Sequence, residues 1–476
     1  MDLHLLDLQS GNTTLMAQMD DPYRTAHFDA ELRPRLALFV LPNGNFAWRT
    51  REAQAAATDG WTDYAELNFA LEYTAPLRIS ADGQFVFVRD NVDTEFLVLT
   101  KRSLTDFSDR ALVYDPTNNA DIQMPIFHAQ RRTPEFVSKY YDLRQSTPNL
   151  SKLLVSWERD DSPPTYYLYD STRAKYKVQS LFNAKQELLQ YPLSKKYPMD
   201  VLTRDGLNEL CYVNIPNQYD VGSKEGASTR PLPTIVFVHG GPWDRDEWIF
   251  KNAQLNPFII DVSQLFTSRG YAVLQCNFRS SLGFGKRQLN AGNKQWGAKM
   301  NTDLVDAVNL AVKRGITKAD QVGLFGVSYG GFGTVAGLAF SPDVFKCGVD
   351  TVGPTDMEDH MLYLINSTSP FLSYRLASYK LRIGDGGPIF HGKNDFRVPI
   401  SQPNRMAAAL KKEKKPFQYV VFPDEGHYFA KPKNIYGFIA KTEEFYAKTC
   451  RLGGVQEPPG EDFEQSTAEI VDQLLE

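Results

Sequence analysis

Residues 326–330 read Gly-Val-Ser-Tyr-Gly, a G-x-S-x-G pattern that Gly331 and Gly333 extend. The apolar run 322–325 precedes the pattern, and the small residues of 334–339 follow it. This order predicts a strand, a sharp turn and a helix, the setting in which a turn lifts a serine nucleophile above the end of a sheet. Glycine is needed there because other side chains would collide with the adjoining strand and helix. The pattern is short, so a glycine-rich turn with an idle serine is the competing interpretation.

Length and composition predict a soluble protein with two domains. The chain has 476 residues, of which 42% are hydrophobic and 23% are charged, and this length exceeds one ordinary domain. Lys and Arg number 52 against 57 Asp and Glu, so no basic footprint for nucleic acid is present. No apolar run approaches the ~20 residues of a membrane span. Residues 1–7 lack the basic and apolar regions of a signal peptide.

The four cysteines, Cys211, Cys276, Cys347 and Cys450, lie far apart and form no C-x-x-C pair. We therefore expect neither zinc nor disulfides, with Cys276 and Cys347 as buried thiols in apolar stretches. This expectation suits a reducing, cytoplasmic setting. No separate motif for a metal, phosphate or nucleotide is present, so the sequence predicts no cofactor.

Residues 1–190 read as an all-β domain, because short β-rich runs alternate with turn signals. The phrases at 6–11 and 168–172 resemble the outer hairpins of propeller blades. A blade needs roughly 40–50 residues, so this region holds about four, the low end of what closes into a ring. A propeller-like domain that is incomplete is our prediction, and a β-sandwich is the alternative.

A second pattern begins at 199 and predicts an α/β-hydrolase-like, doubly wound and mostly parallel sheet. After a hairpin at 199–215 and a polar loop at 217–233, strands alternate with helices, as crossover connections require. We expect strands at 234–238, 271–275 and 347–352, and helices at 259–270 and 303–314. The predicted domains are 1–190, 199–450 and a polar C-terminal tail, 451–476.

The predicted strand 234–238 ends in His239-Gly240-Gly241-Pro242-Trp243. Gly240 and Gly241 would let backbone N–H groups approach a substrate oxygen, as in H-G-G oxyanion loops. The N–H of Tyr329, the residue after the serine, would be the second donor. We expect His239 to brace this loop rather than act as a base. An ordinary strand-ending Gly-Pro turn is the alternative.

Arg279 lies in the loop that leaves the predicted strand 271–275. Two roles are open for it. It supports the oxyanion loop, or it pairs with a surface acid.

A serine hydroxyl needs a base, and the base needs an orienting carboxylate, in the chain order Ser, acid, His. His360 lies in a predicted helix, and His391 precedes the candidate acid. His427 follows the predicted strand at 419–422 in a turn, where a loop-borne base belongs. His427 is therefore the candidate base, with a surface histidine as the alternative.

The orienting acid should end the strand that precedes the base. Asp395 follows the apolar run that begins at Pro388, so Asp395 is the candidate. Asp385 lies before that strand and Asp424 is too close to His427, so both are weaker choices. An ordinary turn aspartate is the alternative for Asp395.

Taken together, residues from about 199 to 450 closely resemble the prolyl oligopeptidase family of serine peptidases, on its acylaminoacyl-peptidase and dipeptidyl-aminopeptidase side. The resemblance implies a β-propeller over an α/β-hydrolase domain, with Ser328, Asp395 and His427 as the triad and entry limited to short peptides. The propeller is shorter than is usual in the family, and so is the segment 365–385. The stretches that carry the resemblance are 239–243, 270–275, 277–279, 289–293, 326–331 and 422–427.

The sequence thus predicts a serine peptidase that hydrolyses short peptides or N-terminally blocked residues through an acyl-enzyme. Short peptides are the predicted partners, with no nucleic acid and no membrane, and a homo-oligomer stays open. One alternative is a carboxylesterase with the same triad. The other is a truncated, inactive family member.

Overall fold

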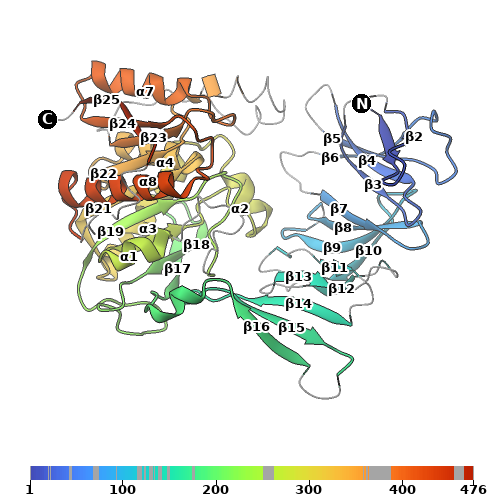
Figure 1. The fold of residues 1–476 in the computed structure, drawn as a ribbon, viewed down its shortest axis with the longest axis horizontal. Coiled ribbons are helices and arrows are strands. Elements are labelled where there is room, and N and C mark those ends of the chain that lie inside the picture. The colour runs from blue at the N-terminus through green and yellow to red at the C-terminus, as the bar shows by residue number, and fades with distance from the viewer. Residues whose placement is uncertain are drawn as a thin grey trace.

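The described residues of the computed structural model form two parts (Figure 1). An N-terminal part carries small antiparallel sheets, and a C-terminal part is built around one nine-stranded sheet. The described residues are 2–19, 21, 23–41, 46–67, 74–92, 94–114, 121–122, 125–127, 132, 134–137, 142–146, 151–173, 177–249, 262–357, 359–360, 363, 387–454 and 466–474.

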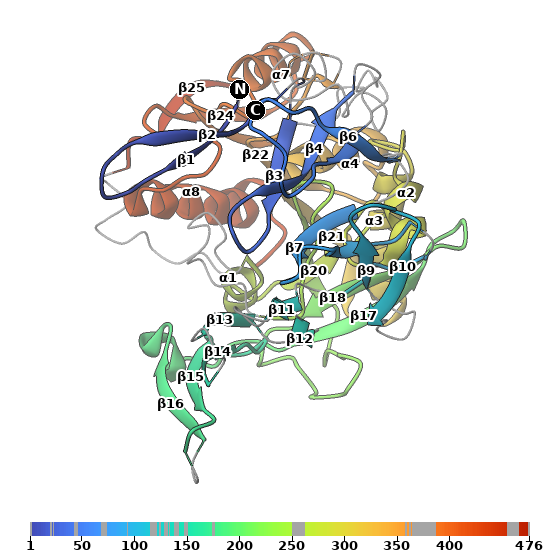
Figure 2. The ribbon, with the colours of Figure 1, turned by 90° about the vertical axis from the view of Figure 1, so that its right-hand side faces the viewer.

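The N-terminal part contains three four-stranded sheets and two strand pairs. Within each four-stranded sheet the strands neighbour one another in chain order, as in propeller blades. The sheets follow one another in an arc, and the last projects beyond the C-terminal part (Figures 1 and 2). Among the described residues no strand pairing joins the first sheet to the last. We had expected about four blades, and three complete ones are described.

The four-stranded sheets comprise β3 (Tyr23–Phe28), β4 (Pro34–Val40), β5 (Phe46–Thr50) and β6 (Thr62–Leu67); β7 (Thr74–Ile79), β8 (Phe85–Asp90), β9 (Val98–Ser103) and β10 (Arg110–Tyr114); and β13 (Asp142–Ser146), β14 (Lys152–Trp157), β15 (Thr165–Asp170) and β16 (Val178–Asn183). The pairs are β1 (Leu3–Leu6) with β2 (Thr13–Ala17), and β11 (Pro125–Phe127) with β12 (Pro134–Val137). A 3-10 turn, η1 (Gln186–Gln190), follows.

The nine-stranded sheet has the order β17-β18-β20-β19-β21-β22-β23-β24-β25. Its central strands, from β20 to β24, are parallel, so their carboxyl ends meet at one edge. This edge is where ligands bind in open α/β sheets. The strands are β17 (Lys196–Leu202), β18 (Asn208–Asn214), β19 (Leu232–Val238), β20 (Ala272–Cys276), β21 (Thr317–Val327), β22 (Cys347–Thr351), β23 (Pro388–Gly392), β24 (Phe417–Phe422) and β25 (Glu469–Leu474).

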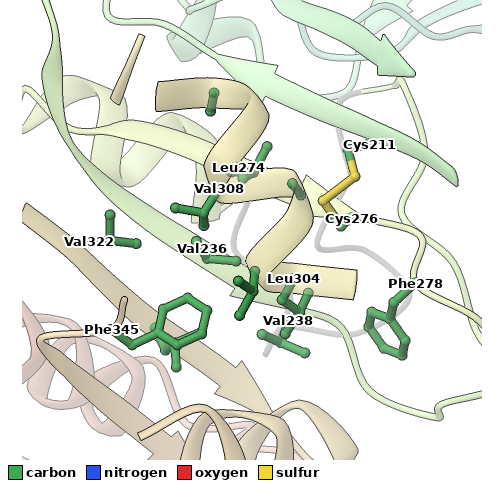
Figure 3. Packing of buried hydrophobic residues seen from close by; sticks show 14 of the residues in the cluster. Cys211, Val236, Val238, Leu274, Cys276, Phe278, Leu304, Val308, Val322 and Phe345 are labelled. Atoms are coloured by element: carbon green, nitrogen blue, oxygen red, sulfur yellow. A yellow bond between two sulfur atoms is a disulfide. The ribbon is translucent and has the colours of Figure 1, made fainter. Parts of the chain in front are cut away.

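Helices cover both faces of this sheet because successive strand residues point to opposite sides. Val236 packs with α3 and α4 on one face, and its neighbour Ile235 packs with α1 and α8 on the other. Figure 3 shows Leu304 and Val308 of α3 against the strand residues of the first face. The helices are α1 (Val262–Ser268), α2 (Gly285–Ala291), α3 (Lys299–Lys313), α4 (Tyr329–Phe340), α7 (Ser401–Lys412) and α8 (Pro432–Glu444), which runs into a π-helix, η2 (Phe445–Thr449).

The expected polar tail is wrong for its last residues. β25 (Glu469–Leu474) pairs antiparallel with β24 and closes the sheet at one end. Most of β25 is exposed, and its sequence, Glu-Ile-Val-Asp-Gln-Leu, does not alternate between polar and apolar residues, so hydrophobic periodicity gave no strand signal. The predicted helix 303–314 begins four residues earlier, at Lys299. The start of the predicted helix 259–270 and the segment 364–386 lie outside the described residues.

The expectation of unpaired cysteines is also wrong. Cys211 of β18 and Cys276 of β20 face each other in the strand register and form a disulfide (Figure 3). Cys347 of β22 forms a second disulfide with Cys450. The paired residues are 65 and 103 positions apart in the chain. No local spacing motif reveals such pairs, because only the tertiary fold brings them together.

Removing the second disulfide is expected to destabilise the C-terminal part. A crosslink that closes a loop of about 100 residues lowers the conformational entropy of the unfolded chain. This stabilises the folded protein by up to ~4.7 kcal/mol, and measured stabilisations are commonly about 2–4 kcal/mol. We expect the double variant Cys347→Ser, Cys450→Ser to unfold at a clearly lower temperature than the oxidised wild-type protein. The control is a thiol count on denatured, unreduced protein. Four free thiols there would contradict both disulfides.

Candidate active site

Ser328 lies at the junction of β21 and α4, where the chain turns sharply. Its backbone has φ 59° and ψ −124°, a conformation that is costly for a residue with a side chain. The turn is tight enough that a Cβ on Gly326 would come 1.8 Å from the Gly330 carbonyl oxygen. A Cβ on Gly330 would come 1.8 Å from the carbonyl oxygen of Val238 in β19. The glycines therefore permit the turn that carries the serine.

The structure brings the three predicted triad residues together. The Nε2 atom of His427 is 3.0 Å from the Ser328 Oγ, and its Nδ1 atom is 2.7 Å from the Asp395 Oδ2. All three follow the carboxyl ends of parallel strands, β21, β23 and β24, at one edge of the sheet. The Asp395 Oδ1 accepts the backbone N–H groups of Arg397 and Val398 at 2.8 and 2.9 Å. His427 and Asp395 are buried.

The predicted oxyanion loop follows β19 and lies against the serine. A Cβ on Gly240 would be 3.3 Å from the Ser328 Cβ and 3.9 Å from its Oγ. Gly241 has φ +113°, which side chains rarely adopt. The Tyr329 N–H belongs to the first turn of α4, where N–H groups have no partner within the helix. Gly240 thus lies close to Ser328, and Tyr329 follows it directly in the chain.

His239 braces the loop, as we expected. Its Nδ1 is 2.8 Å from the Gly240 carbonyl oxygen, so Nδ1 carries the proton. Its Nε2, 2.9 Å from the Ser281 Oγ, then accepts the hydroxyl proton. The ring stacks on Phe278 with centroids 4.4 Å apart. Ser281, which sequence reasoning missed, therefore helps to fix Gly240.

Arg279 pairs with two acids, of which Asp303 is buried and Asp205 is exposed. The Arg279 Nη2 lies 2.6 Å from the Asp303 Oδ1 and 3.0 Å from the Asp205 Oδ1. Burial, and then the nearby Asp303 carboxylate, raise the pKa of Glu209 well above its usual range. The network anchors the segment after β20, which includes Ser281. Arg279 thus pairs with acids and also supports the oxyanion loop through this segment.

The other candidate residues have different partners. His360 is a buried helical residue that stacks on Tyr363. Asp424 pairs with Lys431 and accepts from Asn434, and Asp385 lies outside the described residues. His391, set aside for its place in the chain, lies 3.5 Å from the Asp395 Oδ2 through its Nε2.

Glu425 holds the turn that carries His427, and sequence reasoning missed it. Its carboxylate accepts the N–H groups of Ala430 and Lys431 at 2.9 and 3.0 Å, and the Asn434 side chain at 2.8 Å. The sequence signal was an acid two residues before the candidate base, and the structure buries it.

The N-terminal part contacts the C-terminal part at the start of α2. The Glu95 Oε1 accepts the Arg287 N–H at 2.7 Å, and the Glu95 carbonyl oxygen accepts the Lys286 N–H at 2.8 Å. The Asp121 Oδ2 lies 3.5 Å from the Gly285 N. These acceptors satisfy N–H groups in the first turn of α2, as capping residues do. The N-terminal sheets thus lie beside the segment that follows Ser281.

Loss of this contact is expected to weaken the link between the two parts. Each capping interaction is worth about 1 kcal/mol, so Glu95→Ala with Asp121→Asn should lower the thermal unfolding temperature. Glu52→Ala removes an exposed glutamate of the same N-terminal part and serves as control. An unfolding temperature equal to that of the control would contradict the capping role.

Neither a metal site nor a membrane-spanning helix is found among the described residues. They contain no group of three or more His, Cys, Asp or Glu placed to hold a metal ion. They also contain no helix that is long and apolar enough to cross a membrane.

The chain is similar to known proteins along most of its length. Residues 258–375 and 388–452 match the Prolyl oligopeptidase family. The chain is 32% identical over 520 positions to dipeptidyl aminopeptidase BIII of Pseudoxanthomonas mexicana, covering 98% of this chain and 72% of that protein. It is 30% identical over 512 positions to dipeptidyl peptidase family member 6 of Caenorhabditis elegans, covering 91% of this chain and 66% of that protein.

Among solved structures, the puromycin-hydrolyzing peptidase of Mycobacterium tuberculosis has a TM-score of 0.67 at 19% identity, covering 95% of this chain and 72% of that one. A likeness at this identity supports the fold: an N-terminal propeller with an α/β-hydrolase domain. The chain spans 72% and 66% of the lengths of its two curated relatives named above.

Proposed function

The chain belongs to the prolyl oligopeptidase family of serine peptidases, and we propose that it hydrolyses short peptides or N-terminally blocked residues through an acyl-enzyme on Ser328. The observation that supports this proposal most directly is a pair of contacts from His427. Its Nε2 is 3.0 Å from the Ser328 Oγ, and its Nδ1 is 2.7 Å from the Asp395 Oδ2. A base placed between a hydroxyl and a carboxylate in this way is what activates a serine.

The proposed reaction has two halves. The Ser328 Oγ attacks the peptide carbonyl carbon while the His427 Nε2 takes the hydroxyl proton. The Tyr329 N–H and the loop of Gly240 and Gly241 stabilise the negative oxygen of the tetrahedral intermediate. His427 then gives its proton to the leaving amine, and the acyl ester remains on the serine. Water, deprotonated by His427, releases the acid in the second half.

Two features support short peptides as substrates. The N-terminal sheets contact the segment at α2, beside the residues that brace the oxyanion loop, so they restrict how a chain approaches Ser328. The relatives' names refer to dipeptidyl and acylamino-acid-releasing activities. We propose that this chain takes substrates of one of these two classes.

The test compares leaving groups and N-termini. Dipeptidyl anilides, acyl-aminoacyl anilides and p-nitrophenyl esters are assayed side by side, and a fluorophosphonate probe reports an activated serine. Efficient anilide cleavage together with probe labelling supports the peptidase. Ester cleavage alone identifies the carboxylesterase, and a protein that the probe does not label is the inactive form.

The disulfides bear on the compartment. We expected the cytoplasm because the cysteines looked unpaired. With both pairs bonded, an oxidising compartment is favoured, since disulfides persist there and are rare in the cytosol. The cytoplasmic prediction therefore loses its support from the cysteines. A homo-oligomer and the absence of nucleic acid stay predictions.

A further inference from the structure

His391 lies against the proposed catalytic acid without being part of the proposed triad. It is the fourth residue of β23, four positions before Asp395, and its side chain is fully buried. Its Nε2 is 2.9 Å from the carbonyl oxygen of Val398 and 3.5 Å from the Asp395 Oδ2. Among the described residues its Nδ1 has no hydrogen-bond partner.

These partners fix the proton on the ring of His391. A carbonyl oxygen only accepts, so the Nε2 carries the hydrogen, and the Nδ1 of the neutral ring carries none. A charged ring would place a second N–H where the described residues offer no acceptor. Burial lowers the pKa of His391 to about 4, against the opposing effect of Asp395. The ring therefore stays neutral, in one tautomer, at neutral pH.

The Asp395 carboxylate has about four acceptor positions, two on each oxygen. Both positions on Oδ1 are occupied, and one on Oδ2 is. Two backbone N–H groups bind the Oδ1, and His427 binds the Oδ2. The remaining position on the Oδ2 faces the Nε2–H of His391 at 3.5 Å. This distance exceeds an ordinary hydrogen bond, so the contact is electrostatic. The stronger bond of the same N–H goes to Val398, whose own N–H binds the Oδ1.

We propose that His391 is a positioning residue of the catalytic acid: its Nε2–H fixes the turn from Asp395 to Val398 and directs a partial positive charge at the oxygen that holds His427. The proposal rests on the proposed triad. The consequence is that Asp395 keeps one orientation toward His427. The titratable groups that face His391 are Asp395 and His427.

Two substitutions test the effect of the His391 Nε2–H group independently of the effect of losing the ring. In His391→Gln the side-chain amide reaches the position of Nε2 and still donates. In His391→Asn the amide is one bond shorter and cannot reach Val398. We expect Asn to lower kcat about tenfold, or ~1.4 kcal/mol of barrier, with KM within twofold, and Gln to restore most of the loss.

The pH profile distinguishes this role from a merely structural one. Without the Nε2–H the Asp395 carboxylate attracts the protonated ring of His427 more strongly. The acidic limb of kcat/KM is therefore expected to move upward by about half a unit in His391→Asn and to stay in place in His391→Gln. An unmoved or lowered limb in the Asn variant would overturn the proposal, as would equal losses in the two variants.

His27→Asn is the matched control. His27 is a half-buried histidine whose pKa burial also lowers to about 4, but it lies in β3 of the N-terminal part. This variant should keep the kcat and the pH profile of the wild type. If the wild type cleaves anilides and labels with fluorophosphonate while Ser328→Ala does neither, the proposed function stands, and wild-type behaviour of His391→Asn then refutes only the positioning role. An unlabelled wild type refutes the proposed function itself.

Discussion

Ser328→Ala is expected to lower kcat for a peptide anilide by roughly six orders of magnitude, the scale seen when a triad nucleophile is removed. Alanine leaves the Nε2 of His427 without the hydroxyl that lies 3.0 Å away, so the acyl-enzyme cannot form. KM should change little, because the substitution removes only the Oγ. The fold should also survive, since alanine has the same backbone requirements as serine in this turn.

The measurement combines anilide turnover with fluorophosphonate labelling, both of which should vanish. Ser268→Ala is the matched control because Ser268 is an exposed serine on α1, away from the candidate site. Turnover that persists in Ser328→Ala and in a freshly prepared second sample would mean that another group performs the chemistry, and the proposed mechanism would have to be abandoned.

The residues around the serine were predictable because their signals are local. The apolar strand, the glycines and the helix are adjacent in the chain, and steric needs such as those of Gly326 and Gly330 are visible in sequence. Asp395 and His427 also follow recognisable strands, and parallel strands bring their carboxyl ends to one edge. The order of the residues in the chain and the predicted order of the strands were therefore sufficient to select the candidate triad residues.

Features that depend on distant pairings were not predictable. The disulfide of Cys347 joins residues 103 positions apart. β25 (Glu469–Leu474) gains its structure from pairing with β24, and its sequence does not alternate between polar and apolar residues. His391 was dismissed on chain order, although strand geometry places it beside Asp395. In each case the informative property is a neighbour in space. A single sequence, read on its own, does not show which residues become neighbours.

Asp395→Asn is expected to lower kcat by about four orders of magnitude through the histidine tautomer. The Oδ1 position of residue 395 accepts two backbone N–H groups, so an asparagine would keep its carbonyl oxygen there. Its NH₂ group would then occupy the place of the Oδ2, 2.7 Å from the His427 Nδ1. The Nδ1 must accept from that donor, which moves the ring proton to the Nε2. Protonated Nε2 cannot take the proton of Ser328.

The rival acid supplies the control. Asp424 pairs with Lys431 and not with His427, so Asp424→Asn should keep kcat within about threefold of the wild type. A larger loss in Asp424→Asn than in Asp395→Asn would reverse the assignment. The double variant Ser328→Ala, Asp395→Asn gives a sharper measure, because residues that act as one unit are not additive. Once the hydroxyl is gone the tautomer of His427 no longer matters, so the double variant should be no slower than Ser328→Ala alone.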